Sequence, residues 1–137
     1  MFQNVYKHSL TIVNIMDKFP CELVVWKVLP AIRKELSIYL VKKKRMKTKD
    51  VAKMLGITDA AVSQYIHKKR ATEFALEKQL MPAIEELAEK IIAEEQKKRK
   101  MEYMKGSCSL CRQIRLAGML CSIHKGSAKG CTICLGE

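Results

Sequence analysis

The C-terminal stretch of the chain repeats a pair of residues that bind metals. Two Cys-x-x-Cys pairs, Cys108/Cys111 and Cys131/Cys134, are separated by residues 112–130, and a Cys-x-x-His pair lies between them. Two thiolates at this spacing can reach one metal ion from a single tight turn, and the separation of the pairs is typical of four-cysteine zinc sites. The pattern predicts a metal or cluster site with the candidate ligands Cys108, Cys111, Cys121, Cys131 and Cys134. Redox disulfides and free thiols are the alternatives.

The residues around the thiols indicate which group they bind. Residues 112–120 read as helix, whereas a zinc ribbon needs hairpin strands. A single acidic residue follows Gly106, so nearby basic side chains could offset the negative charge of a cluster held by four thiolates. We therefore expect an iron–sulfur cluster of the 4Fe–4S type, with zinc as the alternative and a thiol switch as a third reading. His124 is either a further ligand or a solvated loop residue, and Cys21 is expected to be a small buried hydrophobic residue.

A second group of residues lies upstream, where two short amphipathic segments flank a glycine. Val51 and Leu55 are about one helical turn apart and should face inward. Gly56 should end the first helix, because glycine adopts a positive φ angle at little cost. Thr58 should cap the second helix with its hydroxyl group. The spacing predicts a helix-turn-helix within residues 48–70.

The second helix of this unit carries side chains that suit the reading of DNA. A helix that starts at a tight turn can bring its N-terminal residues into the major groove. Gln64 can pair with adenine through two hydrogen bonds, Ala60 can contact a thymine methyl group, and Asp59 can accept from a cytosine amine. The basic residues 68–70 suit phosphates. The alternative is a helical hairpin that binds protein rather than DNA.

Residues 48–70, with the ending His67-Lys68-Lys69-Arg70, resemble the helix-turn-helix of the phage-repressor (XRE/Cro-type) family. Residues 20–25 and 28–33, which read PCELVV and VLPAIR, are similar to those of a group of predicted archaeal transcriptional regulators with a cysteine-rich C-terminal tail. Together these stretches cover about a quarter to a third of the chain. The resemblance implies a DNA-binding regulator and favours a sensory cluster in the tail.

The resemblance also implies roles for individual residues. It places Asp59, Ala60 and Gln64 against bases, and Thr48 and His67 against phosphates. The chain departs from the family at Lys47, where a serine or threonine cap is common, and this replaces a cap with a charge that suits phosphate. The predicted DNA contacts are Thr48, Thr58, Asp59, Ala60, Ser63, Gln64, His67, Lys68, Lys69 and Arg70.

The composition favours a polyanionic partner. The 137 residues carry a formal net charge of +12, because 26 lysines and arginines outnumber 14 acidic residues. Double-stranded DNA is the expected partner, and a Lys/Glu-rich surface of the thermophile type is the alternative. The basic run 42–49 is either solvated surface or a phosphate clamp.

The sequence also bears on where the protein is located. No apolar run reaches the ~20 residues that span a bilayer, and no signal peptide is recognisable, so we expect a cytoplasmic protein without a membrane partner.

These residues must be positioned by helices. Apolar residues recur every three or four positions from Pro20 onward, Pro30 should kink or split that helix, and Pro82 should start a new one. The fully polar run 94–100 is typical of a solvent-spanning connector. We expect an all-α fold: a helix-turn-helix bundle of about five helices in residues 1–93, a helical linker in residues 94–105, and a small cysteine-rich metal- or cluster-binding unit in residues 106–137.

The function expected from these features is sequence-specific regulation of transcription, with a tail that senses iron or redox state. A single module reads few base pairs, so a homodimer is expected, with the face Leu80, Ile84, Leu87 and Ile91 as its partner surface. Trp26 is expected in the core. The alternatives are a DNA-binding protein with a structural zinc tail and an adaptor that contacts the transcription machinery. An enzyme is not expected, because no nucleophile–base pair or phosphate-cradling loop is recognisable.

Overall fold

The described part of the chain is built from helices alone, as the sequence predicts. The structure is a computed structural model, and it describes residues 19–71 and 74–124. Within these ranges there is no strand. None of the described helices is long and apolar enough to cross a membrane.

The first helical rod changes its winding three times along its length, between α and π. It comprises α2 (Pro20–Leu23), the π-helical η2 (Val24–Val28), α3 (Leu29–Ile38) and the π-helical η3 (Tyr39–Lys43). The change from π to α winding falls at Leu29, where the sequence predicts a kink or split. Pro30 explains it, because a proline has no N–H group to donate to the preceding turn.

The remaining described elements are one 3-10 helix and five α-helices. Two short helices, α4 (Thr48–Leu55) and α5 (Asp59–Ile66), come first. After the short 3-10 helix η4 (Lys78–Leu80), α6 (Met81–Ala93) begins with Pro82 in its first turn, as predicted. The chain then turns at Glu94 and Glu95 into the long α7 (Gln96–Leu116), and α8 (Met119–Ile123) folds back from its end.

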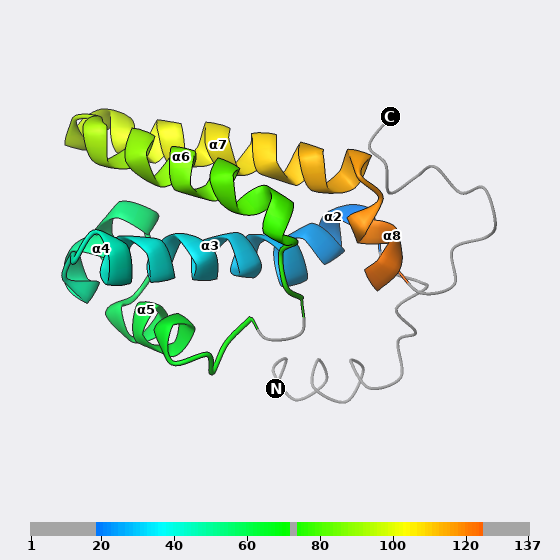
Figure 1. The fold of residues 1–137 in the computed structure, drawn as a ribbon, viewed down its shortest axis with the longest axis horizontal. Coiled ribbons are helices and arrows are strands. Elements are labelled where there is room, and N and C mark those ends of the chain that lie inside the picture. Colours follow the sequence, from blue (N-terminus) through cyan, green and yellow to red (C-terminus); the bar gives the residue numbers. More distant parts are fainter. Residues whose placement is uncertain (1–18, 72–73, 125–137) are drawn as a thin grey trace, which may run out of the picture.

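Figure 1 shows how these helices are layered. Helices α6 and α7 run antiparallel, side by side, and both pack on α3. Helices α4 and α5 lie at one end of α3, and α2 and α8 lie together at the other end. One hydrophobic core joins all of these elements. Its largest fully buried side chains are Leu23, Val28, Ile32, Leu36, Leu40, Val51, Val62, Ile84, Ile91, Ile114 and Leu120.

The expected linker and the expected boundary at Gly106 need correction. Residues 96–105 form the first half of α7, and the helix continues through Gly106 without a break. Tyr103, Leu110 and Ile114 are buried on one face of α7 and belong to the same core as the α4–α5 unit. The polar run is therefore the exposed beginning of a packed helix, and residues 106–124 are not a separate folding unit. Residues 125–137 lie outside the described ranges.

Two further expectations about side chains are wrong. The face Leu80, Ile84, Leu87 and Ile91 is buried inside the single chain, because α7 and α3 cover it, so it is not a free surface for a dimer. Trp26 is 45% exposed rather than part of the core. Residues 1–18, for which the sequence favours no single structure, lie outside the described ranges.

A glycine allows α6 and α7 to approach closely. A Cβ atom built on Gly106 would overlap Cδ1 of Leu87 and lie 3.0 Å from its Cγ atom. Leu87 is itself buried in the core. The absence of a side chain at position 106 therefore sets the distance between the two longest helices.

Candidate functional site

The turn between α4 and α5 has the geometry that its sequence predicts. Gly56 adopts the left-handed conformation, with φ 64° and ψ 34°, and ends α4. The Ile57 amide donates to the carbonyl oxygen of Ala52 at 3.0 Å, so a backbone group freed by the helix end is satisfied. The turn is short because α5 starts at Asp59.

The start of α5 is held by a side-chain cap. The Ala61 amide donates to Oγ1 of Thr58 at 3.1 Å, as predicted for this residue. No such bond caps α4, whose N-cap residue is Lys47, in agreement with the predicted loss of a serine or threonine there.

The Thr58 cap gives a stability prediction with a matched control. Thr58→Ala should lower the free energy of unfolding by about 0.5–2 kcal/mol, because one backbone N–H loses its partner. Thr48→Ala, in the first turn of α4, removes the same atoms but no capping bond. Chemical denaturation of both variants without DNA checks this prediction. Equal losses in the two variants would contradict it.

The buried side of α5 determines which side chains face solvent. Val62 and Tyr65 are buried against α3 and the core. Asp59, Ala60 and Gln64 are consequently exposed, as the sequence predicts for side chains that read bases. Thr58 is also exposed, while Ser63 and Thr48 are half-buried.

The end of α5 is exposed and basic. Nδ1 of His67 lies 2.8 Å from the Ser63 carbonyl oxygen, which fixes the ring at the helix end. Lys68 has a positive φ of 56°, and the chain turns there so that the Lys69 amide donates to the Gln64 carbonyl oxygen at 2.9 Å. The guanidinium of Arg70 lies 5.8 Å from the centre of the Tyr65 ring. All four residues 67–70 are exposed.

Two lysines of the basic run 42–49, which the sequence assigns to solvated surface or to a phosphate clamp, form ion pairs within the protein. Nζ of Lys43 lies 3.3 Å from a Glu85 carboxylate oxygen, and Nζ of Lys44 lies 2.6 Å from Glu89. Tyr39 also donates to Glu89 at 2.8 Å, and the hydrogen bond from Lys44 lowers the pKa of Glu89. These contacts tie η3 to α6. Among the described residues, the basic side chains of the run that form no ion pair are Lys42, Arg45, Lys47 and Lys49.

The described cysteines lie at the opposite end of the bundle. Cys108 is exposed and Cys111 half-buried on α7, one helical turn apart, rather than in the tight turn expected for a metal-binding pair. Cys121 lies on α8, which packs on α7. No group of three or more potential metal ligands occurs within residues 19–71 and 74–124. Cys131 and Cys134 lie outside the described ranges.

A small pocket surrounds the Cys108/Cys111 pair. It measures about 380 Å³ and is lined by Val24, Leu29, Ser107, Arg112 and Arg115 besides the two thiols. Burial raises the pKa of the Cys111 thiol, and the nearby positive charge of Arg115 opposes part of this rise. The two arginines agree with the expectation that basic side chains surround the thiols. His124 is half-buried, and Cys21, expected to be buried, is exposed.

Arg33, which the sequence does not single out, links α3 to α7. Arg33 of α3 donates from Nε to the hydroxyl of Tyr103 on α7 at 3.1 Å. Burial lowers the pKa of Arg33, but interactions with the phenols of Tyr103 and Tyr65 more than offset this and raise it. Arg33 therefore bonds to α7 and lies within electrostatic reach of Tyr65 on α5. An isolated arginine in an amphipathic helix gives no signal of such a role in the sequence.

The two candidate sites are thus separated along the bundle: the exposed face of α5 at one end and the cysteines of α7 and α8 at the other (Figure 1). Comparison with models of known protein families, with curated proteins and with solved structures finds no match for this chain. Conclusions about its function therefore depend on the geometry of the two sites and on the sequence resemblance.

Proposed function

We propose that this protein is a sequence-specific DNA-binding transcriptional regulator whose α4–α5 unit is a helix-turn-helix. The observation that carries the proposal is the exposed N-terminal half of α5, which starts at a tight turn and has its back anchored in the core. In this arrangement the side chains of Asp59, Ala60 and Gln64 can enter the major groove without displacing any packed residue. The resemblance of residues 48–70 to the XRE/Cro-type family supports the same function.

Contacts to the DNA backbone are supplied by the residues that flank α5. Lys68, Lys69 and Arg70 follow the helix directly, and the net charge of +12 favours binding to a polyanion. Thr48, at the start of α4, and His67, at the end of α5, contact phosphates in this proposal. Two copies bind two half-sites as a homodimer, because one module reads only a few base pairs. The dimer forms through a surface other than the buried face of α6.

Selection of bound fragments from genomic DNA tests the proposal. We expect an enriched, two-fold symmetric motif, and binding that weakens steeply as salt rises. Failure to enrich any motif at low salt would contradict DNA reading. Enrichment of an asymmetric motif of a few base pairs would contradict the dimer.

Single substitutions separate base reading from charge. Gln64→Ala should weaken binding to the selected motif by about 1–3 kcal/mol and relax the preference at one base position. Gln113→Ala, also at an exposed glutamine but on α7, should leave the affinity unchanged. Lys69→Ala should weaken all DNA sequences alike. Fluorescence anisotropy with the selected duplex and with a scrambled duplex measures the three effects, and equal losses for Gln64→Ala on both duplexes would contradict base reading.

We further propose that the cysteines bind an iron–sulfur cluster of the 4Fe–4S type, with a structural zinc ion as the alternative. The described residues supply a half-site, because Cys108 and Cys111 share one face of α7 beside Arg112 and Arg115. The remaining thiolates come from Cys131 and Cys134, with Cys121 of α8 as the fifth candidate. A bound cluster would make the tail sensitive to iron and redox state, and the two arginines would offset its negative charge.

Replacement of single cysteines tests this part of the proposal. Cys108→Ser should abolish the bound metal, whether it is iron or zinc, because an outer pair loses one of its two thiolates. Cys21→Ser is the control, since Cys21 is exposed on α2 and outside the predicted ligand set. Metal analysis and the absorption spectrum of anaerobically purified protein give the readout. Brown protein supports the cluster, colourless protein with one zinc supports the alternative, and unchanged metal in Cys108→Ser would contradict the ligand assignment.

A further inference from the structure

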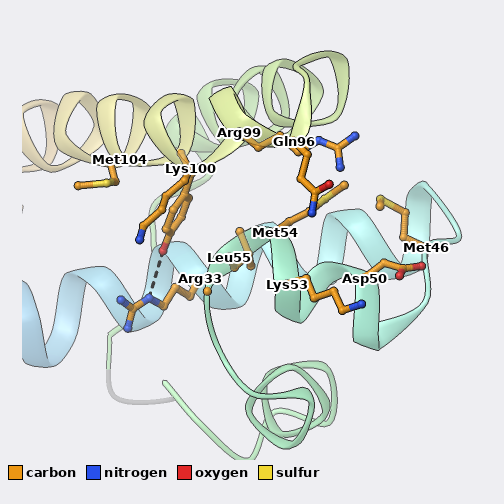
Figure 2. A pocket seen from close by; sticks show the side chains of 12 residues that line it. Arg33, Met46, Asp50, Lys53, Met54, Leu55, Gln96, Arg99, Lys100 and Met104 are labelled. Carbon is orange, nitrogen blue, oxygen red and sulfur yellow. Dashed lines mark hydrogen bonds between the residues drawn. The ribbon is translucent and has the colours of Figure 1, made fainter.

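A pocket lies on the side of α4 that faces α7, away from the solvent-exposed face of α5. It measures about 810 Å³ and opens between α4 and the first half of α7, with Arg33 of α3 at its side (Figure 2). This volume lies within the range of about 300–1,000 Å³ that is usual for small-molecule pockets. Neither the predicted DNA contacts nor the predicted metal ligands line it.

The chemistry of the lining is both cationic and apolar. Four basic side chains, Arg33, Lys53, Arg99 and Lys100, line the pocket against the single carboxylate of Asp50. The lining also includes the apolar side chains of Met54, Leu55 and Met104. A surface of this kind fits a ligand that combines a negative charge with an apolar body.

The positive charges are not evenly distributed. In Figure 2, Arg33 and Lys100 lie at one end of the opening, while Asp50 lies toward the other. Within the described part of the chain, neither Arg33 nor Lys100 forms an ion pair. Arg33 donates one hydrogen bond to Tyr103, and a guanidinium has five N–H donors, so it can bind further acceptors. Two like charges without a counter-charge favour the binding of an anion there.

We propose that this pocket binds a small amphipathic anion, a compound that carries a phosphate, sulfonate or carboxylate group on an apolar body. The anionic group binds Arg33 and Lys100, and the apolar body packs on Met54, Leu55 and Met104. The pocket is a binding site separate from the DNA-reading face and from the cysteines.

The position of Arg33 allows a bound ligand to affect the α5 helix. Arg33 interacts with Tyr103 of α7 on one side and with Tyr65 of α5 on the other. An anion that draws the guanidinium toward Lys100 weakens its electrostatic interaction with Tyr65, whose ring is buried behind the exposed face of α5. This consequence rests on the proposed function, whereas binding of the ligand does not.

Fluorescence titration of the full chain, without DNA, tests the binding site. The probe is anilinonaphthalene sulfonate, which joins a sulfonate to an aromatic body, and its neutral counterpart is phenylnaphthylamine. We expect saturable binding of one sulfonate probe per chain, about tenfold tighter than that of the neutral counterpart, because the charged group adds a charge-assisted hydrogen bond. Absence of saturable binding would overturn the proposal.

Matched substitutions locate the site. Lys100→Glu should weaken the sulfonate probe about tenfold or more, because an attraction becomes a repulsion, and leave the neutral probe unchanged. Lys98→Glu changes the charge equally at another exposed position of α7, outside the pocket, and should have no effect. Met104→Ser should weaken both probes, while Met101→Ser should not, although the two methionines are 56% and 57% exposed.

Two results with these variants would show that the probe does not bind in the pocket. Equal losses in Lys98→Glu and Lys100→Glu would mean that the probe responds to overall charge, and this would overturn the proposal. Unchanged binding in Met104→Ser would place the probe elsewhere, for example on the exposed Phe19, Val25 and Trp26, with the same consequence. A probe that binds in the pocket but leaves the DNA affinity unchanged would contradict only the link to α5.

Discussion

Replacing Ile114 with alanine is expected to lower the free energy of unfolding of the whole chain by about 2–5 kcal/mol, because a fully buried side chain is removed from the core and a cavity remains. Ile114 is 0% exposed and lies near the end of α7, within the cysteine-rich part of the chain. It belongs to the same hydrophobic core as residues of α3, α6 and the α4–α5 unit, although that unit lies at the other end of the bundle. The lower free energy of unfolding should therefore apply to α3, α6 and the α4–α5 unit together.

The prediction can be measured by chemical denaturation with two probes. Circular dichroism follows all helices, and the fluorescence of Trp26, the single tryptophan, follows η2. Both should report one common transition that moves to lower denaturant in Ile114→Ala. Leu116→Ala is the matched control, because Leu116 is on the same helix but 55% exposed, and it should change stability by less than about 0.5 kcal/mol. Two separate transitions, with only one of them shifted, would restore the division of the chain at Gly106.

Gly106→Ala is expected to lower the free energy of unfolding by about 1–3 kcal/mol, because its methyl group overlaps the buried Leu87 side chain and forces α6 and α7 apart. The sign of the change in stability distinguishes a packed position from an exposed one. In an exposed helix the same substitution stabilises by up to about 1 kcal/mol, since alanine has the higher helix propensity. Ser109→Ala on the exposed side of α7 provides the comparison.

A second-site substitution tests the cause of this effect. Leu87→Ala alone should destabilise by about 2–5 kcal/mol through its cavity. In that background Gly106→Ala should cause no further loss, because the space that its methyl group needs is empty, and the two effects should not add. Equal losses in both backgrounds would show that the contact with Leu87 is not the cause.

Gly56 and Gln64 are examples of features that could be predicted from residues close by in the sequence. The end of α4 and the start of α5 depend on residues within a few positions: a glycine with a positive φ and a threonine that caps the next helix. Pro82 likewise marks the first turn of α6. The exposed position of Gln64 follows from the 3.6-residue period once Val62 and Tyr65 are assigned to the core.

For the candidate sites, the sequence predicts which residues take part but not which side chains surround them. The sequence indicates that Cys108 and Cys111 are a pair, but not that both lie on a packed helix. It indicates a basic run, but not that Lys43 and Lys44 are engaged by Glu85 and Glu89 of α6. In each case the missing information is a partner that lies far away in the sequence, so no local period contains it.

The sequence by itself determined the all-helical class, the end of α4, the starts of α5 and α6, and the side of α5 that faces solvent, because capping, glycine conformation and helical period act over a few residues. Only the tertiary structure shows that α7 is a packed helix rather than an exposed connector. Residues 96–100 at its start are all polar, and its buried face begins only at Tyr103, so the sequence indicates a connector there. Gly106 allows α7 to lie close against α6, and this packing buries the face that the sequence offers to a dimer. The pocket beside Arg33 likewise exists only because α7 lies opposite α4 and α3. Such packing depends on which faces meet in space, and this is a property of the whole chain rather than of any one segment.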